Sequence, residues 1–115
     1  MGRHVGLVLT PEVLAAAYNY LRVTPPFNRW KMPLAHNVRF RVTSSPTDAG
    51  YCDRGTIGVS RRCIGYTAYL VEIMAHEMIH LHLDRKNVKK HHVPEFQACA
   101  ARVCAIHGFD PKRFF

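Results

Sequence analysis

The sequence predicts an α+β fold: a single small domain, residues 1–115, with an N-terminal helix, a small antiparallel sheet, and a motif helix packed on a C-terminal helix. Two patterns and the composition support this prediction. Apolar residues recur at helical spacing in three segments, 11–22, 66–83 and 94–107. They alternate with polar residues in two others, 37–43 and 55–60. The chain has 115 residues, of which 48 % are hydrophobic, enough for one domain with a real core.

The first helix is predicted to begin at Thr10-Pro11-Glu12 and to run to about Arg22. A threonine hydroxyl caps helix N-termini, proline is favoured in the first turn, and an acidic side chain suits the positive end of the helix dipole. The segment that follows, "TPPFNRWKMPLAHN", contains three prolines. It is therefore predicted to be an irregular connection, with Trp30 anchoring it to the core.

The middle of the chain is predicted to form the sheet. In "NVRFRVT", Val38, Phe40 and Val42 would face one side of a strand and the two intervening arginines the other. "SSPTDAG" has the composition of a turn, and "GTIGVS" is a second short strand with its two β-branched apolar residues on one face. A further strand is expected between them over 51–53.

Two helices complete the chain. In the first, over 66–83, one apolar stripe is formed by Leu70, Ile73, Met74, Met78 and Leu81. A basic connection, "DRKNVKKHH", follows, with Asn87 as the predicted helix stop. Pro94 opens the last helix, and Gly108 is predicted to end it, with Pro111 just beyond.

The stretch "MAHEMIHLHLD" contains His76, Glu77 and His80 in the pattern H-E-x-x-H. Helix residues four apart differ by about 40° and one turn, so the two imidazoles can hold one metal ion. Glu77 is rotated by about 100° from His76 and can instead lean over a water on that metal. This is the arrangement of zinc metallopeptidases, with two histidine ligands and a glutamate general base.

The alternative interpretation of the motif is an ordinary amphipathic helix with two histidines on its polar face. The flanking apolar residues, which include Met74, Met78 and Ile79, predict that the histidines are partly buried. Buried imidazoles need a partner, which favours the metal interpretation. His82, about 200° around the helix from His80, is predicted to point away, and His107 is predicted to have a structural role.

Two histidines do not complete a zinc site, and spacing leaves the third ligand open. The metzincin pattern would place a histidine at position 86, where this chain has Lys86, so that pattern is excluded. A glutamate on the next helix would be Glu95, and a histidine just before that helix would be His92 or His91. The four cysteines form no C-x-x-C pair, so a zinc ribbon is not supported and buried thiols are expected.

"HEMIHLHL" followed by "HHVPEF" resembles the SprT-like zinc metallopeptidases, which include the Spartan proteases. Their pattern is H-E-x-x-H, a short connection, and H-G-x-x-F at the start of a helix. The segment 92–96 matches it with Val93 in place of glycine, and "YCDRGTIGVS" resembles the strand before the motif helix. The resemblance covers 51–109. It implies a zincin-like fold, Zn²⁺ bound by His76, His80 and His92, and Glu77 as general base.

The balance of charge favours acidic partners. Lys and Arg total 16 against 8 Asp and Glu, which gives +8 with neutral histidines. Such a charge suits DNA, although it also serves solubility. Seven residues are candidates for a DNA-contacting surface: Arg39, Arg41, Arg61, Arg62, Lys86, Lys89 and Lys90.

No apolar run is long enough for a membrane span or a signal peptide, so a cytoplasmic or nucleoid-associated location is expected.

Three functions fit these observations. The leading one is a zinc metalloendopeptidase that hydrolyses protein or peptide substrates, including DNA-associated proteins. The second is a non-catalytic zinc-stabilised basic module that binds DNA or a protein partner, in which a fourth side chain would complete the metal site. The third is a peptidase-like regulator that acts on one repressor protein.

Overall fold

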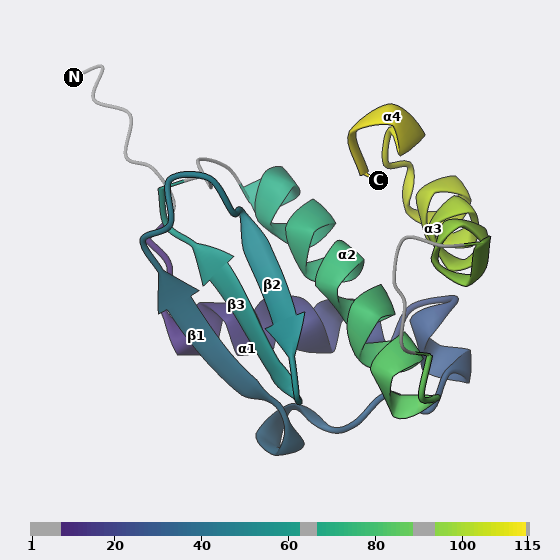
Figure 1. Cartoon of the computed structure of the whole chain (residues 1–115), viewed down its shortest axis with the longest axis horizontal. Coiled ribbons are helices and arrows are strands. Elements are labelled where there is room, and N and C mark those ends of the chain that lie inside the picture. The colour runs from purple at the N-terminus through teal and green to yellow at the C-terminus, as the bar shows by residue number, and fades with distance from the viewer. Residues whose placement is uncertain (1–7, 63–66, 89–93, 115) are drawn as a thin grey trace.

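The structure, a computed structural model, describes residues 8–62, 67–88 and 94–114 and has the predicted α+β architecture. Its elements in order are α1 (Pro11–Arg22), η1 (Phe27–Arg29), η2 (Ala35–Asn37), β1 (Arg39–Thr43), β2 (Gly50–Asp53), β3 (Thr56–Ser60), α2 (Thr67–Arg85), α3 (Pro94–His107) and α4 (Pro111–Phe114). Helix α1 packs behind the sheet against β1 and α2 (Figure 1). Helix α2 borders β2 and β3, and α3 and α4 lie on its side away from the sheet.

The sheet is mixed, so the prediction of an antiparallel sheet was wrong. The strand order is β1-β3-β2, with β1 parallel to β3 and β2 antiparallel to β3. Arg54 and Gly55 have φ of 49° and 81°, as in the two-residue turn that closes a tight hairpin. This hairpin pairs β2 with β3, so the loop 44–49 must carry the chain across the end of β3. The Ser60 hydroxyl donates to the Ser45 carbonyl at 2.6 Å and holds that loop.

Helix α1 has the predicted bounds and the predicted cap. The Val13 amide donates to the Thr10 hydroxyl at 3.1 Å. Its buried face also fixes the irregular connection, because the Tyr18 hydroxyl donates to the Pro33 carbonyl at 2.6 Å. Trp30 packs edge-on against buried Phe27 at 5.1 Å between ring centroids, which confirms the predicted anchor.

Helix α2 is more deeply buried than one apolar stripe predicts. Four of the five predicted stripe residues are buried, and Ile73 is half-buried. Three further apolar residues are also fully or almost fully buried: Ala75, Ile79 and Leu83. Contacts with the sheet, α1 and α3 surround this helix, so polar side chains on it are buried as well.

The predicted helix ends are confirmed. Asn87 follows α2 with φ of 62°, and Gly108 follows α3 with φ of 78°.

Cys52, Cys99 and Cys104 are free thiols, and burial raises the pKa of Cys52 to about 12. No helix in the described ranges is long and apolar enough to cross a membrane.

Candidate metal centre

The two motif histidines converge on one point. The Nε2 atoms of His76 and His80 lie 3.3 Å apart, with ring centroids 4.9 Å apart. Zinc binds imidazole nitrogen at about 2.0–2.1 Å, and a tetrahedral angle between two such bonds separates the nitrogens by about 3.3 Å. The pair therefore has the nitrogen separation that a zinc ion requires, and its donor type fits zinc.

A backbone carbonyl fixes the ring of His76. The Nδ1 atom of His76 lies 2.8 Å from the carbonyl oxygen of Phe114 in α4. Because a carbonyl only accepts hydrogen bonds, Nδ1 carries the hydrogen and Nε2 keeps its lone pair. Metal-binding histidines usually have such a partner on the nitrogen that does not bind the metal. Phe114 thus supplies the partner that orients His76 for a metal.

Aromatic side chains pack around both imidazoles. Phe96, which is fully buried at the start of α3, lies 4.6 Å from the His80 ring and 5.0 Å from the His76 ring. Phe114 lies 5.6 Å from the His76 ring. Two helices far from the motif in sequence therefore restrict the orientation of both histidines.

Glu77 is buried beside strand β2. Its exposed fraction is 5 %, and burial raises the pKa of its carboxyl group to about 8. A Cβ atom at Gly50 would lie 3.0 Å from Glu77 Oε2 and 2.8 Å from Ile73 Cγ2. A side chain at position 50 would therefore crowd the carboxylate. A cation on the neighbouring histidines would favour the ionised carboxylate and lower its pKa.

The described residues do not supply a third ligand. Predicted His92 and its alternative His91 fall outside the described residues. Among the residues that the structure describes, no three His, Cys, Asp or Glu side chains form a metal-binding group. Glu95 belongs to that part and is exposed, so it does not complete a site with His76 and His80.

The other two described helix histidines lie away from this centre, as predicted. His82 stacks on Trp30 with centroids 4.3 Å apart and planes 13° apart. Desolvation, with the nearby charges of Lys86 and Arg85, lowers the pKa of His82 to about 4. The Nε2 atom of His107 lies 2.8 Å from the Pro25 carbonyl, which ties the end of α3 to the connection after α1.

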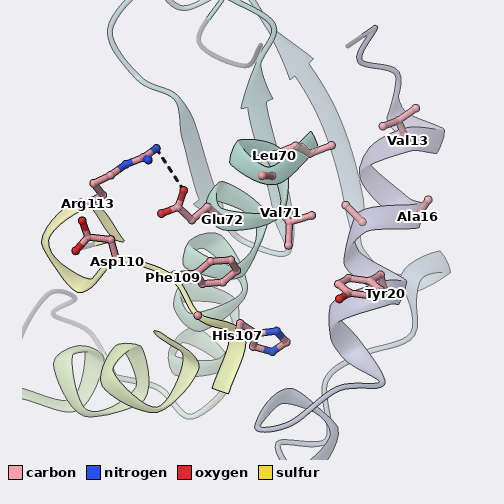
Figure 2. A pocket seen from close by; sticks show the side chains of 13 residues that line it. Val13, Ala16, Tyr20, Leu70, Val71, Glu72, His107, Phe109, Asp110 and Arg113 are labelled. Carbon is pink, nitrogen blue, oxygen red and sulfur yellow. Dashed lines mark ion pairs between the residues drawn. The ribbon is translucent and has the colours of Figure 1, made fainter. Parts of the chain in front are cut away.

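A prominent cavity among the described residues is separate from the metal centre. It has a volume of about 820 Å³ and lies between α1, the first half of α2 and the α3–α4 junction (Figure 2). Its walls are mostly apolar, and the ion pair between Arg113 and Glu72, 3.4 Å long, lies at one side. Arg113 and Phe114 are adjacent, so α4 contributes one side chain to this cavity and a carbonyl to His76.

Phe114 and Gly50 belong to the site but were not predicted from sequence. The contribution of Phe114 is a backbone carbonyl, which has no side-chain signature. The one available signal was Asp110-Pro111, a helix start in which the Lys112 amide donates to Asp110 Oδ1 at 3.0 Å. Gly50 was predicted to lie in a turn, and its contact with Glu77 depends on how α2 packs on β2.

A buried H-E-x-x-H helix packed on a small sheet defines a metallopeptidase-like domain. The model of the SprT-like family matches residues 22–114, most of the chain, and this protein therefore belongs to the SprT-like family. The match extends beyond 51–109, the part that carried the resemblance, and includes β1 and α4. No curated protein and no solved structure matches the chain.

Removal of α4 should weaken metal binding. A chain that ends at Asp110 lacks the Phe114 carbonyl, and loss of such a partner costs about 10- to 100-fold in metal affinity. Competition with a chromophoric chelator measures the zinc affinity. Phe114→Leu, which keeps the carbonyl, should stay within about threefold of wild type. Equal zinc affinity in the shortened and full chains would contradict the assigned role of α4.

Proposed function

We propose that this protein is a zinc-dependent metalloendopeptidase, with His76, His80 and His92 as metal ligands and Glu77 as general base. The strongest support for this proposal is the geometry of the two motif histidines. The two Nε2 atoms lie 3.3 Å apart, and the Phe114 carbonyl directs the Nε2 lone pair of His76 toward His80. A zinc ion bound there supplies Lewis acidity for the scissile carbonyl and lowers the pKa of a bound water.

Glu77 is suited to hold and transfer a proton. Its carboxylate would take a proton from the attacking water and give it to the nitrogen of the leaving amine. The buried setting supports this role, because burial makes the carboxylate a stronger base while a neighbouring cation would keep it ionised and able to accept the proton. Because Gly50 has no side chain, the Glu77 carboxylate can lie against β2 without a clash.

The first test is metal content with chelator-sensitive cleavage. Purified protein should hold about one zinc per chain and cleave an unfolded protein substrate, and a chelator should abolish both. Zinc-loaded protein that leaves a broad panel of unfolded substrates intact would favour the non-catalytic zinc module instead.

The second part of the proposal is that its substrates are proteins associated with DNA. The net charge of +8 supports it. Of the predicted DNA-contacting residues, five belong to the described part of the chain and are exposed: Arg39, Arg41, Arg61, Arg62 and Lys86. The other two, Lys89 and Lys90, lie outside it. Cleavage of a DNA-bound protein that is no faster than cleavage of the same protein free in solution would argue against this part.

Gly50→Ala should impair catalysis more than it impairs folding. The added Cβ would crowd Glu77 Oε2 and Ile73 Cγ2. We expect about 1–3 kcal/mol of destabilisation, as is typical of overpacking. Because Glu77 must shift, cleavage by zinc-loaded folded protein should fall at least about tenfold.

Gly55→Ala is the matched control for this prediction. Gly55 has a φ of 81°, and nothing lies within 4 Å of the position that a Cβ would take, so an alanine there is strained without touching the site. It should lower the unfolding midpoint while cleavage per folded molecule stays at the wild-type level. Equal loss of cleavage in both variants would refute the role of Gly50.

A further inference from the structure

A second cavity lies at the C-terminal end of α2. It has a volume of about 530 Å³ and is bounded by η1 and the two residues that follow it, the end of α2, and α3. Five basic residues from these separate segments line it: Arg29, Lys31, Arg85, Lys86 and Arg102. No acidic residue of the described chain lines it. We refer to it as the basic cavity.

Within the part of the chain that the structure describes, no ion pair neutralises the charges of the basic cavity. All five basic residues are exposed, and within the described ranges none of them takes part in an ion pair. Five positive charges in one concavity repel one another, and a hollow lined by one sign of charge concentrates the field inside it. An anion in the cavity would relieve this repulsion.

Trp30 and His82 form an aromatic wall of the cavity. Trp30 stacks on His82 at 4.3 Å, and its edge contacts buried Phe27. Lys31 directly follows Trp30 and has a φ of 54°, in the left-handed region.

We propose that the basic cavity binds a phosphate-bearing anion. Three of its five cations are arginines, whose planar guanidinium groups match phosphate oxygens in paired hydrogen bonds, and the lysines add mobile point charges. Of the five, only Lys86 belongs to the surface predicted from sequence, so this site shares one residue with that surface. It does not depend on zinc chemistry. The phosphate can belong to a small polyphosphate or to a nucleic-acid strand.

Trp30 provides the readout for a binding experiment. It is the chain's single tryptophan, so intrinsic fluorescence reports on the wall of the basic cavity. The full chain would be titrated with sodium tripolyphosphate and, separately, with single-stranded oligothymidylate. Saturable change with tripolyphosphate alone assigns the site to small phosphates. Saturable change with the oligonucleotide assigns it to a strand, and the slope of log affinity against log salt should then become shallower by about 1.4 when two phosphate contacts are removed.

Two matched double variants locate the site. Arg85→Gln with Arg102→Gln should weaken binding of the probe at least tenfold. Arg54→Gln with Lys112→Gln removes the same charge from exposed positions outside the basic cavity and should change binding less than threefold. Circular dichroism confirms that each variant is folded, and Lys31→Gln with Lys86→Gln serves as a second cavity variant. Equal weakening in cavity and control variants, or no saturable change with either probe, would overturn the proposal.

Discussion

Glu77→Gln should keep its zinc and lose peptide hydrolysis. Glutamine has nearly the same shape as glutamate, so the buried packing beside Gly50 is retained. Its amide cannot take a proton from water, and general-base catalysis typically contributes about 10²- to 10⁴-fold to the rate. We therefore expect a loss of that size in kcat, measured on zinc-loaded protein with an unfolded protein substrate.

Glu95→Gln is the matched control for Glu77→Gln. Glu95 is an exposed residue at the start of α3, and it is the other glutamate considered for this site. Its replacement should leave both zinc content and cleavage unchanged. Cleavage at the wild-type rate by zinc-loaded Glu77→Gln would show that another group is the base.

Glu77→Gln should also change how the free energy of unfolding depends on pH in the metal-free protein. Burial raises the pKa of Glu77 from 4.5 to about 8. Between these values the folded chain binds more protons than the unfolded chain, so its stability falls as pH rises from about 4.5 to about 8. Glutamine does not titrate, and the corresponding part of this pH dependence should disappear from denaturant unfolding curves.

His80→Ala should abolish zinc binding. The His80 imidazole is 8 % exposed, and its Nε2 atom lies beside that of His76. Loss of one of three ligands should cost more than the 10- to 100-fold typical of a residue that only orients a ligand, so affinity should fall by more than about 100-fold. Because metal binding stabilises the folded state, zinc should raise the unfolding midpoint of wild type and not of this variant.

His82→Ala is the control on the same helix. His82 stacks on Trp30, away from the motif pair. Its removal should lower stability through lost packing while the protein still holds one zinc. A full zinc content in His80→Ala, or equal zinc loss in both variants, would contradict the assigned ligands.

The sequence was sufficient for features whose causes are local. The Thr10 cap, Asn87 after α2 and Gly108 after α3 were predicted because a helix end depends on a few adjacent residues. The alternation in β1 was readable for the same reason. The rotation about the helix axis from His76 to His80 depends on helix geometry alone. The convergence of the two imidazoles could therefore be predicted without knowing the rest of the fold.

Features that depend on distant packing could not be predicted. The parallel pairing of β1 with β3 results from a hairpin that inserts β3 between the other two strands. The Phe114 carbonyl reaches His76 because α4 folds back on α2, 38 residues along the chain. The basic cavity joins Arg29, Arg85 and Arg102, which no sequence window contains together.

The most direct test of the proposed metallopeptidase site is zinc X-ray absorption spectroscopy of the zinc-loaded wild-type protein. A catalytic site should show three imidazole nitrogens and one water oxygen, since such sites keep one position open for water and substrate. Replacement of His92 should remove one of those nitrogens, which identifies the third ligand. Four protein ligands, or any sulfur on the metal, would contradict a catalytic zinc and favour the non-catalytic zinc module.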